Sequence, residues 1–171
     1  MNSLTAVLLN WFKAFVLVAA AQTAPWAAGY FLGHRLGAPI DAGLKLPDGR
    51  RLLGDHKTWR GFVAAVLACA VAASLLGYSV RLGLAFAALS LAGDAASSFI
   101  KRRLHLAPGT EIPGLDQIPE ALAPLLTLCR RLGIGVGGAC ALTGIFLLID
   151  LATMPLRHRP SSGDGPKRSR T

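Results

Sequence analysis

Long apolar runs constrain the fold of this chain more than any other feature of its sequence. A run of about 20 apolar residues can cross the ~30 Å hydrocarbon core of a bilayer as one helix. With 53% hydrophobic and only 16% charged residues, the 171-residue chain is too apolar for an ordinary soluble domain. We therefore expect an all-α integral membrane protein, a bundle of about five transmembrane helices joined by two cytoplasmic polar loops. The expected helices cover about 4–23 (with the alternative of a continuation past a kink at Pro25), 61–77, 80–100, 119–129 and 134–154.

Basic residues are concentrated in segments 34–60 and 101–116 and after Leu156. Cytoplasmic loops of membrane proteins carry an excess of Lys and Arg, so we predict these three segments in the cytoplasm and the N-terminus outside the cell membrane. The tail, 157–171, is rich in Pro, Ser, Gly and basic residues and is predicted to be disordered, apart from the membrane domain at 1–156. In this setting the net charge of +9 predicts contact with anionic membrane lipids and no nucleic acid.

The fourth apolar run leaves two alternatives open. Residues 119–129 are few for a full membrane crossing, unless Arg130 and Arg131 extend to the interface at its far end. A re-entrant hairpin is the other arrangement, but it would place the basic tail outside, against the charge rule.

The densest polar stretch, Gly54-Asp55-His56-Lys57-Thr58-Trp59-Arg60-Gly61, stands directly before the second apolar run. Polar groups beside a membrane span are costly to hold there, which favours a functional interpretation. Lys57 offers a compact point charge, Arg60 a planar fork of donors and Thr58 a hydroxyl, so the stretch suits an anionic, phosphorylated ligand. The alternative is that these residues only mark the cytoplasmic side, although that rule requires no acid, imidazole or glycine.

A second polar group interrupts the end of the third apolar run. Asp94, Ser97, Ser98 and Lys101 have the spacing i, i+3, i+4 and i+7, so they share one helix face. An unpaired carboxylate inside a membrane helix costs roughly 2.5–3.5 kcal/mol, so Asp94 should face the bundle interior and meet a cation. The alternative is a structural pair of Asp94 with Lys101 or with an arginine. Asp116 has its own alternative, because a polar residue at a helix start is favoured by the helix dipole alone.

The polar motifs together resemble those of the CDP-archaeol synthase family, and the resemblance covers about Leu4 to Met154. The matching motifs are Pro39-x-Asp41-x-Gly43, Asp48-Gly49-Arg50-Arg51, the stretch Gly54 to Gly61, Gly93-Asp94, Ser98-Phe99-Ile100-Lys101-Arg102-Arg103 and Leu115-Asp116-Gln117.

The resemblance implies a small membrane enzyme, a CTP-dependent cytidylyltransferase. It implies that two cytoplasmic loops bind CTP with Mg²⁺, and that a lipid phosphate attacks the α-phosphorus of CTP with release of pyrophosphate. Mg²⁺ prefers hard oxygen ligands, so Asp94 and Asp116 are the expected metal ligands. The expected catalytic residues are Asp94, Asp116, Lys57 and Lys101. The expected substrate-binding residues are Asp41, Asp55, His56, Thr58, Arg60, Ser98, Arg102 and Gln117.

One position departs from the family pattern. The family commonly carries a second acid two or three residues after Asp-Gln, and here Ile118-Pro119-Glu120 follows Gln117. This leaves the choice between an ester and an ether lipid substrate open.

Two other classes of function remain as alternatives. A small transporter of an anionic or phosphorylated ligand would also use intramembrane charge and basic loops, but its polar residues would be spread over several helices at mid-depth. A non-enzymatic scaffold would not need the Asp94 and Asp116 pair. The crowding of polar residues on one face favours an enzyme. The oligomeric state is left open.

Overall fold

The computed structural model describes residues 3–33, 35, 37–47, 49, 51–54, 57–106, 112 and 114–157. Over these residues the secondary structure is helical, apart from two isolated β-bridges in the first polar loop. The helices are α1 (Ser3–Leu32), α2 (Trp59–Leu75), α3 (Val80–Arg103), α4 (Gln117–Leu132) and α5 (Gly135–Arg157). The predicted all-α bundle is therefore confirmed.

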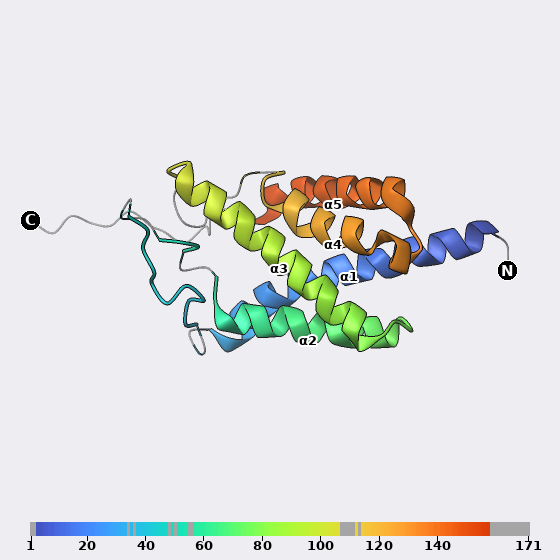
Figure 1. Cartoon of the computed structure of the whole chain (residues 1–171), viewed down its shortest axis with the longest axis horizontal. Coiled ribbons are helices and arrows are strands. Elements are labelled where there is room, and N and C mark those ends of the chain that lie inside the picture. The colour runs from blue at the N-terminus through green and yellow to red at the C-terminus, as the bar shows by residue number, and fades with distance from the viewer. Residues whose placement is uncertain are drawn as a thin grey trace, which may run out of the picture.

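Successive helices run in opposite directions through the bundle (Figure 1). The ends of α1, α3 and α5 and the starts of α2 and α4 lie at one end of the molecule, and the N-terminus lies at the other (Figure 1). The two polar loops therefore share one end, as the distribution of basic residues predicted. The assignment of that end to the cytoplasm stays a prediction. The predicted tail, 157–171, lies beyond the described residues except for the last position of α5.

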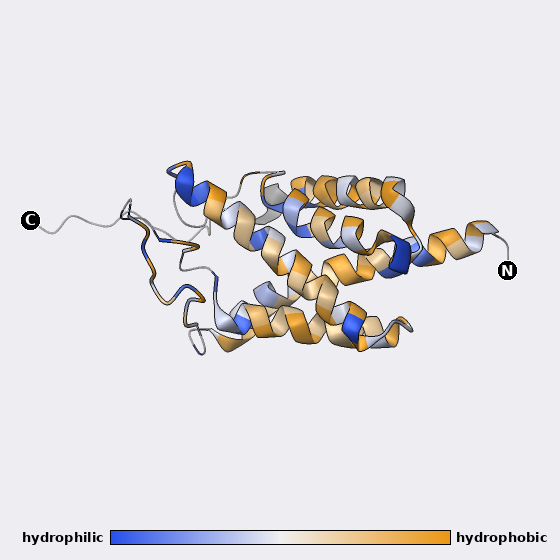
Figure 2. Ribbon diagram, viewed as in Figure 1, coloured by the Kyte–Doolittle hydropathy of each residue, from blue (hydrophilic) through white to orange (hydrophobic). Residues whose placement is uncertain are grey.

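Three helices, α1, α3 and α5, are long and apolar enough to cross a membrane. At 17 residues, α2 is also apolar but shorter. Large apolar side chains such as Leu67, Val71 and Leu148 are exposed, as suits a bundle surrounded by hydrocarbon. Apolar residues predominate along the helices (Figure 2).

Two helix boundaries differ from the expected ones in informative ways. Pro25 lies inside α1, which continues to Leu32, so the continuation past Pro25 is the arrangement present. Helix α4 is a single helix of 16 residues, longer than expected, and it ends at Leu132. The C-cap is Gly133, whose φ of 69° is the left-handed conformation that glycine adopts readily. A single helix excludes the hairpin alternative.

Small residues allow the helices to approach closely. A Cβ added at Gly83 of α3 would lie 2.4 Å from the carbonyl oxygen of Cys69 in α2. A Cβ added at Gly93 would lie 2.2 Å from the carbonyl oxygen of Pro119 in α4. Membrane helices associate through such van der Waals contact, because burial of apolar surface gives them little advantage over lipid. These two contacts hold α3 against both of its neighbours.

Candidate functional site

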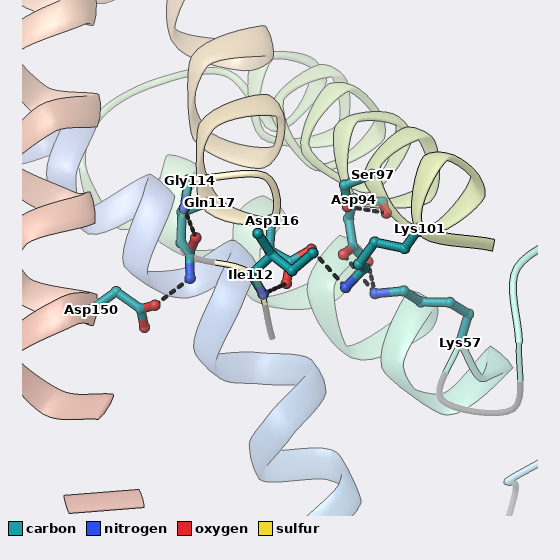
Figure 3. Close-up of polar contacts among 9 residues, drawn as sticks. All are labelled: Lys57, Asp94, Ser97, Lys101, Ile112, Gly114, Asp116, Gln117 and Asp150. Carbon is teal, nitrogen blue, oxygen red and sulfur yellow. Dashed lines mark hydrogen bonds and ion pairs between the residues drawn. The ribbon is translucent and has the colours of Figure 1, made fainter. Parts of the chain in front are cut away.

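The first part of the site is an ion pair between Lys57 and Asp94. Lys57 immediately precedes the N-cap of α2, and Asp94 lies on α3. The ammonium Nζ lies 2.5 Å from both carboxylate oxygens, in a position where the side chains are 27% and 22% exposed (Figure 3). Asp94 is therefore paired with a cation, as predicted from the cost of an unpaired acid inside a membrane helix. Its partner is Lys57 and not Lys101.

Lys101 and Asp116 form the second pair. The Lys101 Nζ atom lies 2.7 Å from Oδ1 of Asp116, and the backbone N–H of Ile112 donates to Oδ2 at 3.3 Å (Figure 3). Asp116 is the N-cap residue of α4 but makes no capping hydrogen bond with its side chain. Its carboxylate is instead directed toward Lys101 of α3. The helix dipole alone would not explain this contact.

Asp150 belongs to the same polar cluster, and the sequence reasoning missed it. The side-chain amide of Gln117 accepts a hydrogen bond from the N–H of Gly114 at 2.8 Å and donates from Nε2 to the carboxylate of Asp150 on α5 (Figure 3). Asp150 lies in the last third of the fifth apolar run. The cost of an acid inside a membrane helix, which singled out Asp94, is the signal that would have found it.

Glu120 adds a fourth carboxyl group to the cluster. It lies in the first turn of α4, where its electrostatic neighbours are Asp94, Lys57, Asp116 and Asp150. The close packing of Gly93 on the first turn of α4 brings it there, since a Cβ at Gly93 would also lie 2.9 Å from the Glu120 nitrogen. The acid that departs from the family spacing therefore still reaches the site.

Asp41 organises the first polar loop. Its side chain is fully buried and accepts hydrogen bonds from Arg51 at 2.6 Å and from the N–H groups of Gly43, Leu53 and Gly54, each at 3.1 Å. Burial alone would raise the pKa of Asp41, but the Arg51 side chain and these three backbone donors lower it to about 2. The predicted substrate-binding role of Asp41 is untested. The contacts present show a carboxylate that holds the loop together.

Residues just before Asp41 also tether the backbone at Lys57. Ile40 N–H donates to the Lys57 carbonyl at 2.8 Å, and Trp59 N–H donates to the Ala38 carbonyl at 3.0 Å. The backbone at Lys57 is therefore fixed by hydrogen bonds to the first loop, and its side chain contacts Asp94.

We expect the protection of this loop to depend on pH. Because the pKa of Asp41 is about 2 in the folded loop against 3.8 ordinarily, its ionisation stabilises the loop at neutral pH. That contribution, about 2 kcal/mol, is lost as the pH falls from about 5 toward 2. Hydrogen-exchange protection of the Gly43, Leu53 and Gly54 amides, corrected for intrinsic rates, should fall over this interval. In Asp41→Asn it should be low already at pH 7 and nearly independent of pH. Equal protection in both proteins at pH 7 would contradict this role.

Two residues of the predicted phosphate-binding stretch are engaged elsewhere. The Arg60 guanidinium donates to the carbonyls of Gly33 and Arg35, just after the end of α1. The Thr58 hydroxyl caps α2 by accepting from Gly61 N–H at 3.4 Å. In this structure Arg60 is therefore held at the end of α1, and the substrate roles of both residues stay predictions. Asp55 and His56 lie outside the described residues.

The remaining predicted residues lie on the buried face of α3. Ser98 and Arg102 are only 4% and 7% exposed, and the adjacent Ser97 is fully buried and donates to the Asp94 carbonyl at 2.8 Å. Arg103 lies over the Phe99 ring and donates to the Arg51 carbonyl at 3.4 Å, which joins the end of α3 to the first loop. The shared face predicted from the spacing of Asp94, Ser97, Ser98 and Lys101 agrees with this burial.

The donor chemistry of the site fits Mg²⁺ that arrives with phosphate. Among the described residues, no group of three or more acidic, His or Cys side chains is arranged to hold a metal ion. Asp94 and Asp116 nevertheless offer hard carboxylate oxygens on two neighbouring elements, each neutralised by a lysine. Mg²⁺ commonly takes one or two carboxylates and completes its shell with substrate phosphates and water, so two acids suffice.

Comparisons with known proteins agree with this arrangement. Residues 7–136 match the model of a family described as CarS-like, CDP-archaeol synthase. A CDP-archaeol synthase of Methanosphaerula palustris is 38% identical over 149 residues, which are 78% of this chain and 85% of the relative. One of Pyrococcus horikoshii is 40% identical over 100 residues, 52% of this chain and 59% of the relative, so that alignment spans little more than half of its length.

A solved structure of an intramembrane enzyme for archaeal membrane lipid biosynthesis has the same fold. It superimposes with a TM-score of 0.62 at 34% identity, over 90% of this chain and 95% of the solved one. The family match over residues 7–136 includes all four residues of the two ion pairs. Together with the structural similarity, that match shows that the chain belongs to the CDP-archaeol synthase family.

Proposed function

We propose that this protein is a CTP-dependent cytidylyltransferase that converts a phosphatidate-like lipid phosphate into a CDP-lipid and releases pyrophosphate. The observation that carries the proposal is the pairing of Lys57 with Asp94 and of Lys101 with Asp116 at the loop end of a membrane bundle. This pairing supports the proposal because lysine commonly binds phosphate and carboxylates are preferred ligands of Mg²⁺, and both kinds of group lie together at that end of the bundle.

The lysines and the acids have separate tasks in this reaction. Lys57 and Lys101 turn from their carboxylates to the triphosphate and neutralise the charge that builds up on the departing pyrophosphate. Asp94 and Asp116 would be the residues that hold Mg²⁺, which would supply further positive charge against the phosphates. The resting ion pairs keep both acids and both lysines neutralised until the nucleotide arrives.

The transfer itself is a displacement at phosphorus. An oxygen of the lipid phosphate forms a bond to the α-phosphorus of CTP, the bond from that phosphorus to the bridging oxygen of the β-phosphate breaks, and pyrophosphate leaves with that electron pair. A phosphate monoester with a second pKa near 6 is ionised at neutral pH, so the attacking oxygen needs no general base. The protein therefore contributes orientation and charge stabilisation.

The position of the site suits both substrates. The polar loops would face the cytoplasm, where CTP is dissolved, and the lipid head group would stay at the membrane surface beside the start of α2. The basic residues of the loops would attract both the nucleotide and anionic head groups.

The direct test is incubation of the purified protein with labelled CTP, Mg²⁺ and a panel of lipid phosphates with ester-linked or ether-linked chains. We expect label to enter the lipid fraction as CMP with equimolar pyrophosphate. The preferred member of the panel decides between the two lipid types. Absence of labelled lipid with every substrate would refute the activity.

Lys57→Ala should weaken CTP binding about 10- to 100-fold, because the loss of a charged partner of phosphate costs roughly 1.5–3 kcal/mol. Calorimetric titration in detergent measures the dissociation constant, and added salt should reproduce part of the loss in the wild type. Lys57→Arg should keep the charge without fully restoring the geometry. Lys45→Ala is the matched control, since Lys45 is an exposed lysine of the same loop. Equal affinities for CTP in Lys57→Ala and Lys45→Ala would rule out the contact.

A further inference from the structure

An apolar cavity of about 370 Å³ lies beside the Lys57–Asp94 pair, between α1, α2 and α3. Pro25 of α1, Phe62 of α2 and Leu91 of α3 line it, and Ile40 and Leu53 of the first loop contribute to its wall. A cavity of this size fits a small ligand or part of a larger one. The polar site described above gives no role to these apolar walls.

The cavity has one charged end. Of the lining side chains that the structure describes, only Lys57, Asp94 and Thr58 are polar, and the Thr58 hydroxyl already caps α2. An occupant must therefore be apolar over most of its length and carry its polar group near Lys57. A nucleobase does not suit these walls, because its hydrogen-bonding edges would lose water without gaining partners.

The cavity borders the outer surface of α2 and α3. Ala88 and Ala92 line it and are exposed, and Phe62 is 37% exposed. Ala88 and Ala92 stand one helical turn apart on the same face of α3, and their methyl groups take little space. Gly61 and Pro25 also line the cavity, and α2 packs closely on α1 there, since a Cβ at Gly61 would lie 3.3 Å from the Cβ of Pro25.

We propose that this cavity holds the part of one hydrocarbon chain nearest the head group of the lipid phosphate, and that Ala88 and Ala92 set the chain width that can enter. The proposal rests on the proposed function for the identity of the head group. A two-chain lipid is larger than the cavity, so the rest of its chains stays in the bilayer. The chain enters from the side of the bundle, and its phosphate then lies next to Lys57.

Photo-crosslinking tests occupancy without any need for turnover. The probe is a lipid phosphate with a diazirine on the first carbons of one chain, irradiated with the wild-type protein without CTP. We expect adducts on Phe62, Leu91 or Ala92, suppressed by excess unlabelled lipid phosphate but not by the corresponding neutral diglyceride. Adducts confined to the outer residues Leu67 and Val71, or cavity adducts that lipid phosphate does not suppress, would show only bulk lipid and overturn the proposal.

Substitution of Ala92 tests the chain width. The substrates are two lipid phosphates, one with linear chains and one with methyl branches near the head group. Ala92→Leu should lower kcat/KM for the branched substrate relative to the linear one by about tenfold, the effect of a methyl-sized change in an apolar pocket. The KM for CTP should not change. The control is Ala96→Leu, one turn further along α3, at an exposed alanine that does not line the cavity.

The two experiments also separate this proposal from the proposed function. An unchanged substrate ratio in Ala92→Leu, or the same change in Ala96→Leu, would overturn the role of the alanines. If no lipid phosphate accepts CMP but the cavity adducts form and lipid phosphate suppresses them, the proposed activity fails while the chain site stands.

Discussion

Replacement of Asp94 by asparagine is expected to lower CMP transfer by at least about a hundredfold, with the helical bundle intact. Asparagine keeps the shape of the side chain but removes the charge that pairs with Lys57 at 2.5 Å. It also removes one of the two carboxylates that would hold Mg²⁺. Initial rates of CMP transfer at saturating CTP and lipid measure the loss, and the elution volume and thermal unfolding in detergent report the fold.

The matched control is Ser97→Ala on the same helix. The Ser97 hydroxyl donates to the backbone carbonyl of Asp94, so its removal leaves the carboxylate and the ion pair with Lys57 in place. We expect this variant to keep most of the wild-type rate. Near-normal turnover in Asp94→Asn would refute the assignment of Asp94 to the reaction.

Gly93→Ala is expected to cause the largest loss of stability among single changes near the site. The added Cβ would lie 2.2 Å from the Pro119 carbonyl oxygen, closer than any real contact, and backbone cannot move aside as a flexible side chain can. Overpacking of this kind typically costs 1–3 kcal/mol, and in rare cases more. Because α4 carries Asp116 and Glu120, the shift that relieves the clash also moves both acids from α3. Thermal unfolding in detergent and the rate of CMP transfer should therefore fall together.

Gly144→Ala is the control, because it makes the same substitution at a position where the added methyl group has room. Gly144 lies inside α5, and a Cβ there would meet nothing within 4 Å. Alanine favours a helix over glycine by up to about 1 kcal/mol, so this variant should unfold at the wild-type temperature or slightly above it. The close packing of α3 on α4 would be contradicted if both variants unfolded alike.

The fold was largely predictable because membrane insertion demands long apolar helices, and such runs are visible in a sequence. The ends of α4 were not predictable from hydropathy alone. Polar Gln117 begins the helix, and Arg130 and Arg131 lie in its last turn, so the apolar run is shorter than the helix. The stop at Gly133 follows from the conformation of its backbone and not from its hydropathy.

The site was predictable where local spacing decides it. The i, i+3, i+4 and i+7 pattern placed Asp94 and Lys101 on the interior face of α3 in advance. Their partners were not predictable, because the choice of Lys57 for Asp94 depends on how the first loop folds back over α3. Arg60 illustrates the same limit, since a carbonyl at the end of α1 competes for it. Asp150 could have been predicted without any tertiary information, because the cost of an acid inside a membrane helix applies to it as it does to Asp94.

The short range of the Asp41 contacts has a consequence for the biosynthesis of the protein. Among the described residues, no hydrogen bond to this carboxylate joins positions more than 13 apart. Closure of so short a loop costs little entropy, so this part can form once its own residues have emerged. The Lys57–Asp94 pair spans 37 residues and the Gln117–Asp150 contact spans 33, so each must wait for a later helix to insert. A nascent chain halted after α2 would therefore carry a formed loop and an unpaired Lys57, and the arrival of α3 would complete the first ion pair.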